Sequence, residues 1–80
     1  MAWFVYILEC SDKSLYTGST NDLGSRIERH RSGKGAKYTR SRGVKRLVFS
    51  KKCGSRSAAL KKEAKIKKLS RGEKLELIYK

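Results

Sequence analysis

The chain has 80 residues, which is enough for one domain, 1–80, with a small core. It carries 21 Lys and Arg residues and 7 Asp and Glu residues, a net charge of +14. Such a charge predicts a polyanionic partner. Nucleic acid is the default candidate, because clustered cations bind phosphates with release of counterions. No apolar run is long enough for a membrane span and the N-terminus does not resemble a signal peptide, so we expect a cytoplasmic protein with no membrane partner.

The N-terminal part predicts a β-hairpin followed by a helix. Residues 3–8 are all aromatic or aliphatic, which is typical of a central strand covered on both faces. A polar turn at 11–14 and a second strand at 15–19 complete the hairpin. Asn21 is the expected N-cap of a helix at 22–31, which the glycine-containing segment 32–35 ends.

The remaining part predicts a basic loop, a strand and two helices. The loop is expected to last until Gly43, and residues 45–51 predict the third strand. Ser55 opens a helix that reaches Leu69, and Ser70 with Glu73 has capping-box spacing at the start of a short helix ending at Ile78. The expected fold class is therefore α+β, a small layered fold.

The helix at 22–31 places a histidine on its apolar side. At 100° per residue, Leu23, Ile27 and His30 share a narrow arc. Arg26 lies at the edge of this arc, whereas Arg29 is expected to point elsewhere. Two interpretations remain open: an arginine at the core edge with a hydrogen-bonded histidine, or a guanidinium and an imidazole held for a phosphate.

The helix at 55–69 places a carboxylate among apolar residues. Its expected apolar arc contains Ala59, Leu60, Ala64 and Ile66, opposite most of its lysines. Glu63 lies within this arc, and a carboxylate is costly to bury unless it is paired or binds a cation. Glu63 is therefore either the partner of Lys67 in an i, i+4 pair or the ligand of a metal ion.

An ordered set of residues runs along the chain: Phe4-Val5-Tyr6, Tyr16-Thr17-Gly18, Arg26, His30 and Glu63. The two tyrosines ten apart, the glycine two residues after the second, the arginine eight further on and the glutamate on a later helix resemble the GIY-YIG nuclease family, above all its small stand-alone bacterial members. The resemblance implies a three-stranded antiparallel sheet with the first strand central, flanked by about three helices. It also implies an endonuclease-like activity, the metal-dependent hydrolysis of phosphodiester bonds in DNA.

The resemblance also implies roles for single residues. Tyr6, Tyr16, Arg26 and His30 are the expected catalytic residues, with Arg26 on the scissile phosphate, and Glu63 is the expected ligand of one divalent metal ion. Mg or Mn suits this oxygen ligand. A free tyrosine has a pKa near ~10, so Tyr6 needs nearby positive charge or must relay its proton, and His30 is the candidate relay.

The sequence departs from the family motif at the first strand and the second. Phe4 replaces the first glycine, Val5 the first isoleucine and Thr17 the second isoleucine, and none of these changes removes a catalytic group. Ser19 follows Gly18 where some relatives have a lysine, so we expect one phosphate contact of those relatives to be missing.

A catalytic role for both tyrosines makes a geometric prediction. In an uninterrupted hairpin, Tyr6 and Tyr16 share a face only if paired residue numbers add up to an even value. An even-length turn at 11–14 would place them on opposite faces, so we expect an odd-length turn or a bulge. A central first strand also places Cys10 and Cys53 at opposite ends, so we expect them to be unbridged, and their isolation argues against a zinc site.

The loop from Lys34 to Lys45 is the expected contact with nucleic acid. Its candidate residues are Lys34, Lys37, Tyr38, Arg40 and Arg42, which would clamp a backbone or stack on a base. The alternative is a solvated basic loop.

Two functions remain open at this stage. One is a nuclease acting on DNA, including branched or damaged DNA as in DNA repair; the other is a non-catalytic module that binds DNA, RNA or the ribosome on a nuclease scaffold. DNA is favoured over RNA. Because no separate DNA-binding domain accompanies the motif, we expect low specificity or a protein partner that supplies it.

Overall fold

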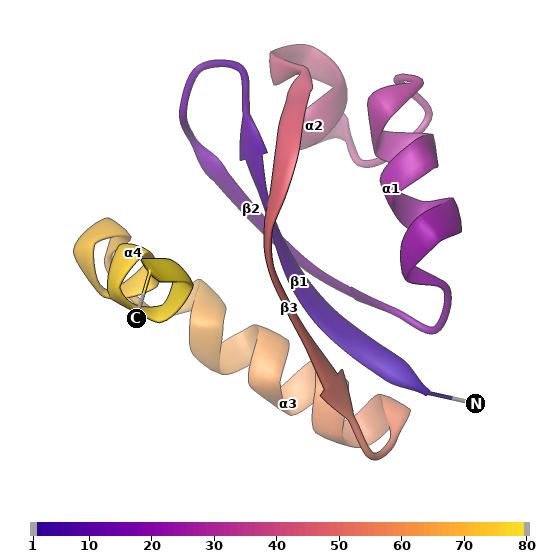
Figure 1. The fold of residues 1–80 in the computed structure, drawn as a ribbon, viewed down its shortest axis with the longest axis vertical. Coiled ribbons are helices and arrows are strands. Elements are labelled where there is room, and N and C mark those ends of the chain that lie inside the picture. The colour runs from indigo at the N-terminus through magenta and orange to yellow at the C-terminus, as the bar shows by residue number, and fades with distance from the viewer. Residues whose placement is uncertain (1, 80) are drawn as a thin grey trace.

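A computed structural model describes residues 2–79. The elements in chain order are β1 (Trp3–Cys10), β2 (Leu15–Thr20), α1 (Leu23–Arg31), α2 (Lys37–Arg42), β3 (Val44–Cys53), α3 (Arg56–Lys67) and α4 (Arg71–Tyr79). The sheet is three-stranded and antiparallel in the order β2-β1-β3. Figure 1 shows α1 and α2 on one side of this sheet and α3 and α4 on the other. The predicted α+β class with a central first strand is confirmed.

The hairpin register brings the two motif tyrosines to one face. Tyr6 pairs with Gly18 and Leu8 with Tyr16, so paired numbers add up to an even value. Cys10 N–H donates to the Ser14 carbonyl at 2.8 Å, which leaves the odd-length tip 11–13. Lys13 has φ of 70°, the left-handed conformation that ends a three-residue hairpin loop. The prediction of an odd-length turn is confirmed.

β3 pairs along the whole of β1 and is longer than the predicted 45–51. Its register shifts twice, between Ile7 and Leu8 and between Glu9 and Cys10. Such shifts bend and twist a strand, which lets β3 follow a shorter partner. Cys10 lies opposite Val44 at one end of the sheet, and Cys53 lies opposite Trp3 at the other. Both cysteines are free, as predicted.

The helix ends follow from local capping. Ser55 accepts from the N–H of Ala58 at 3.1 Å, as predicted for an N-cap. Ser70 and Glu73 form the predicted capping box, with reciprocal hydrogen bonds of 2.9 and 3.2 Å. The N-cap of α1 is Asp22, whose carboxylate accepts from Ser25 N–H at 3.1 Å, and the prediction of Asn21 is wrong by one residue.

The segment 37–42 is a helix, α2, and the prediction of a loop up to Gly43 is wrong here. The buried residue of α2 is Thr39, a polar side chain, so no apolar periodicity marks the helix in the sequence. Gly43 follows it with φ of 76°, a conformation that favours glycine.

The apolar core lies between the sheet and α3. Val5 and Ile7 point to this side and pack with Ile66. The predicted apolar arc of α3 is only half right, because Ala59 and Ile66 are buried whereas Leu60 is 46% exposed and Ala64 is also exposed. The buried face of α3 is centred on Ala59 and Ile66, and Glu63 lies at its margin.

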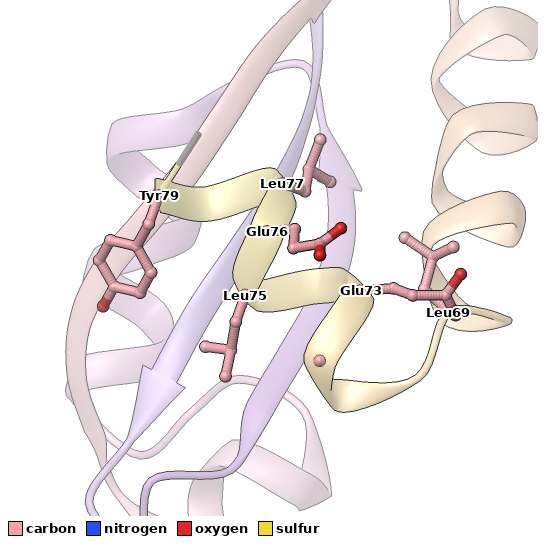
Figure 2. A pocket seen from close by; sticks show the side chains of 7 residues that line it. Leu69, Glu73, Leu75, Glu76, Leu77 and Tyr79 are labelled. Atoms are coloured by element: carbon pink, nitrogen blue, oxygen red, sulfur yellow. The ribbon is translucent and has the colours of Figure 1, made fainter.

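A shallow, mostly apolar hollow runs along α4 (Figure 2). Its lining residues are Leu69, Gly72, Glu73, Leu75, Glu76, Leu77 and Tyr79. The charged residues among them are two glutamates, so this surface does not suit a polyanion. Within residues 2–79 no helix has the length and apolarity needed to cross a bilayer.

Candidate active site

Tyr6 lies in the middle of β1 with its hydroxyl over the edge strand β2. The side chain is 1% exposed. A Cβ added to Gly18 would lie 2.5 Å from Tyr6 Oη, so only a glycine at position 18 leaves room for this hydroxyl. The absence of a side chain at Gly18 of β2 therefore leaves the space that the Tyr6 side chain of β1 occupies.

His30, in the last turn of α1, contacts hydroxyls on both sides of its ring. Its Nε2 lies 3.0 Å from Tyr6 Oη, and its Nδ1 lies 2.7 Å from Thr39 Oγ1 of α2. Thr39 in turn donates to the Ala36 carbonyl at 3.0 Å. Tyr6, His30 and Thr39 thus form one hydrogen-bonded chain that connects β1, α1 and α2.

An aromatic cluster surrounds this chain. The Tyr16 ring centroid lies 5.2 Å from that of His30 and 5.7 Å from that of Tyr38. The Arg42 guanidinium lies over the Tyr38 ring at 4.0 Å and pairs with Asp12 at 3.1 Å. Tyr38 and Arg42 therefore fasten α2 to the hairpin, and a nucleobase would have to displace Arg42 to stack on that face of Tyr38.

A small cleft opens beside the ring of His30. It is lined by Tyr16, Arg26, Arg29, His30, Lys34, Gly35 and Ala36. Its volume of about 220 Å³ lies below the ~300–1,000 Å³ typical of small-molecule pockets, so it suits a phosphate group of a polymer better than a free ligand. Three cationic side chains line it, which favours an anion.

Arg29 was expected to point away from the site, and this prediction is wrong. The cleft lies beside the helix rather than under it, so exposed arginines on the flank of α1 reach it with their long side chains. Among the other predicted contacts, Lys34 lines the cleft, whereas Lys37 and Arg40 are exposed on α2 outside it.

Burial and charge keep both Tyr6 and His30 neutral near pH 7. Burial, and then the neighbouring Tyr16, raise the pKa of Tyr6 to about 12, although the positive charge of Arg26 opposes the shift. Burial, and then the charges of Arg26 and Arg29, lower the pKa of His30 below its usual value of 6.5. Tyr6 is therefore a hydroxyl beside a neutral imidazole that can accept its proton.

Glu63 approaches β2 from the other side of the sheet. Ser19, next to Gly18, donates from Oγ to Glu63 Oε1 at 2.6 Å, and Lys67 Nζ lies 2.8 Å from Oε2. The negative charge of Glu63 also contributes, less than burial and Tyr16 do, to the raised pKa of Tyr6. The pair with Lys67, one of the two interpretations of Glu63, is present.

The donor set decides how a divalent metal ion would fit. Within the described part of the chain no three His, Cys, Asp or Glu side chains come together as a metal cage. Mg²⁺ commonly uses one or two carboxylates and takes its other ligands from water and substrate phosphates. Glu63 fits this mode, because its carboxylate already holds a cation, the ammonium of Lys67.

Besides Arg29, the sequence interpretation missed two residues of the site, Thr39 and Gly35. An added Cβ at Gly35 would collide with His30 Nδ1, so the loop before α2 lies directly on the imidazole. Neither residue stands out in the sequence, because each becomes part of the site only when residues 35–39 fold back over α1.

Comparisons with known proteins find relatives over nearly the whole chain. The family model described as the GIY-YIG catalytic domain matches residues 2–76. A UPF0213 protein of Syntrophus aciditrophicus is 58% identical over 76 residues, which are 94% of this chain and 87% of that protein. The UPF0213 protein OB0043 of Oceanobacillus iheyensis is 53% identical over 75 residues, again 94% and 87%.

Two solved structures share the fold. The solution NMR structure of the UPF0213 protein BH0048 from Bacillus halodurans has a TM-score of 0.62 and 51% identity, covering 98% of this chain and 83% of that one. The solution NMR structure of the protein EF2693 from E. faecalis has a TM-score of 0.62 and 42% identity, covering 92% and 79%.

Proposed function

The chain belongs to the GIY-YIG catalytic domain family, which is a nuclease-type family, and we propose that it is a metal-dependent endonuclease that hydrolyses phosphodiester bonds in DNA. One observation carries the proposal. The buried hydroxyl of Tyr6 is hydrogen-bonded to a neutral His30, and His30 lines a cleft together with two arginines. Such a chain offers a proton acceptor beside a phosphate site, which hydrolysis of a phosphodiester requires.

The proton pathway runs from water through Tyr6 to His30. As a water oxygen forms its bond to phosphorus, its proton passes to Tyr6 Oη and the phenolic proton passes to His30 Nε2. The bond from phosphorus to the leaving oxygen breaks, and that oxygen departs with the electron pair. Because Tyr6 gains a proton from water as it gives its own to His30, no free phenolate has to form. The pKa of about 12 for Tyr6 therefore does not prevent the transfer.

The two arginines bind the phosphate and adjust the base. Arg26 and Arg29 compensate the negative charge that develops on the non-bridging oxygens. A phosphate bound between them also screens the charges that hold down the pKa of His30. His30 therefore becomes a better proton acceptor when substrate is present than when it is absent.

Glu63 is the proposed ligand of one Mg²⁺ or Mn²⁺ ion. The chemistry that such an ion supplies when bound is stabilisation of the charge on the leaving oxygen. Ser19 fixes Glu63 Oε1 on the α3 side of the sheet, and Lys67 is the group that has to give way at Oε2.

A second candidate function has one specific observation in its favour. Both carboxylate oxygens of Glu63 are engaged, and the serine that holds one of them stands where some relatives have a lysine. A domain that has lost its metal would keep the cleft and the net charge of +14, and would bind nucleic acid without cutting it.

Cleavage of a labelled panel separates the two functions. The panel holds single-stranded, duplex, flap and four-way-junction DNA with an RNA duplex, each assayed with Mg²⁺, with Mn²⁺ and with a chelator. Glu63→Gln should abolish cleavage and preserve or strengthen binding, because it removes the proposed metal ligand and one negative charge from a domain that binds a polyanion. Glu76→Gln, the same charge change on exposed α4, is the matched control and should cleave like wild type.

Each outcome assigns one function. Metal-dependent cleavage by wild type and by Glu76→Gln, but not by Glu63→Gln, supports the nuclease and names its preferred substrate. Tight binding by all three proteins without a cleaved product supports the binding module. Equal cleavage by wild type and Glu63→Gln would remove Glu63 from the mechanism.

A further inference from the structure

The imidazole of His30 is held at both nitrogens by hydroxyls from different elements. Nε2 faces Tyr6 of β1, and Nδ1 faces Thr39 of α2. Both contacts are shielded from bulk water, because His30 is 3% exposed and Thr39 is 1% exposed. The position of the ring proton therefore depends on what these two hydroxyls donate and accept.

The direction of each hydrogen bond follows from the Ala36 carbonyl. A carbonyl oxygen only accepts, so the single hydroxyl proton of Thr39 is used at Ala36. Thr39 Oγ1 must then accept from His30, which places the ring proton on Nδ1. A neutral imidazole with its proton on Nδ1 has its lone pair on Nε2, so Tyr6 donates to it.

The opposite tautomer has no comparable set of partners. A proton on Nε2 would leave Nδ1 as an acceptor, and Thr39 would have to turn its proton away from Ala36 to meet it. A ring flip would place ring carbons where Nε2 and Nδ1 now face the two hydroxyls, so both hydrogen bonds would be lost. The surroundings therefore select one tautomer in one orientation.

We infer that Thr39 is a positioning residue for the proton relay: its buried hydroxyl fixes His30 as the Nδ1–H tautomer, so that the lone pair on Nε2 receives the proton of Tyr6. This role rests on the proposed nuclease function, whereas the tautomer itself is a property of the folded chain without substrate. Thr39 acts only through His30 and touches no reacting atom.

Nitrogen-15 NMR of the histidine ring tests the tautomer directly. The chain has one histidine, so the ring signals need no assignment. Above the pKa of His30, wild type should show a protonated Nδ1 and an unprotonated Nε2. Thr39→Ser keeps the hydroxyl and should give the same spectrum, whereas Thr39→Val loses the acceptor and should shift population toward the Nε2–H form.

Thr17→Val is the matched control for loss of a threonine hydroxyl. Thr17 is also buried, but it lies on the opposite face of the sheet from Tyr6, so its replacement should leave the ring signals unchanged. If Thr39→Val does not fold, Thr39→Ala removes the same hydroxyl with less bulk. A wild-type ring protonated on Nε2, or one unchanged by loss of the Thr39 hydroxyl, overturns the inference.

Kinetics tests the consequence for the reaction. Thr39→Val should lower kcat by about 10- to 100-fold with KM nearly unchanged, and Thr39→Ser should restore kcat. Normal kcat in a variant whose tautomer has changed would overturn the positioning role. No cleavage by wild type would overturn the proposed function instead, and the NMR result would still decide the tautomer.

Discussion

Replacing Lys67 by methionine tests whether this lysine competes with a divalent cation for Glu63. The two side chains lie 2.8 Å apart, with Lys67 54% exposed and Glu63 17% exposed. Unit charges ~4 Å apart interact by about 1 kcal/mol in water and about 4 kcal/mol near a protein surface. Because the ammonium is exposed, the lower figure applies. A divalent ion bound at Glu63 would be repelled by the ammonium of Lys67 with twice this energy, about 2 kcal/mol. We therefore expect Lys67→Met to bind the ion roughly 10- to 30-fold more tightly.

Electron paramagnetic resonance of Mn²⁺ measures this affinity without any turnover. The titration is done on the free protein and again with an oligonucleotide that resists cleavage, since a phosphate is expected to complete the coordination. Lys65→Met is the matched control, because it removes the same charge from an exposed position on the same helix. In thermal unfolding, Lys67→Met should lower the free energy of unfolding by only about 0.3–0.5 kcal/mol, which is the contribution of a typical exposed i, i+4 ion pair.

The comparison between the two lysine variants decides the result. Equal Mn²⁺ affinity of Lys67→Met and Lys65→Met would mean that only general charge matters and that Lys67 is not a competitor. Weaker binding in Lys67→Met would mean that the lysine orients Glu63 for the ion instead of blocking it.

Thr17→Val should raise the free energy of unfolding by about 1 kcal/mol in denaturant titrations, because among residues 2–79 nothing hydrogen-bonds the buried Oγ1 of Thr17; unchanged or lower stability would argue against this. The contribution of neutral His30 to the free energy of unfolding should be fully present above about pH 6.5 and should decrease as the pH falls below it, because the pKa of His30 is lowered in the folded protein and the unfolded chain therefore takes up a proton on this histidine more readily. A His30→Gln variant with the same pH dependence would exclude His30 as the cause. Affinity for duplex DNA should fall about a thousandfold between 50 and 200 mM salt if roughly six phosphates are neutralised, and a flat response would speak against a nucleic-acid partner.

The elements of the fold were largely predictable because their signals are local. The run of apolar residues at 3–8 marks a covered strand, and Ser55 and the pair Ser70 and Glu73 mark helix starts by hydrogen bonds within three residues. The helix at 37–42 was not predictable in this way. Its buried side chain is Thr39, whose partner His30 lies on another element.

For the candidate site, the sequence indicated which residues belong together but not how they are arranged in space. Tyr6, Tyr16, Arg26, His30 and Glu63 stand out in the sequence as an ordered set of types that suit phosphodiester chemistry. Their geometry was not determined there. A shift of one residue in the hairpin would have placed Tyr16 on the face opposite Tyr6, and the tip at 11–13 decides between the two registers.

The sequence by itself thus determined the class of fold and the strongly basic character, because composition, periodicity and capping act over a few neighbouring residues. The set of candidate catalytic side chains came from the resemblance of its motifs to the GIY-YIG family. Only the tertiary structure decided that Arg29 joins Arg26 at the cleft, that Thr39 and Gly35 hold the imidazole, and that Ser19 of β2 holds Glu63. Each of these contacts joins side chains whose distance depends on how helices pack beside the sheet or on which rotamers they adopt. Such distances are set by the packing of the whole chain, and no local pattern in the sequence encodes them.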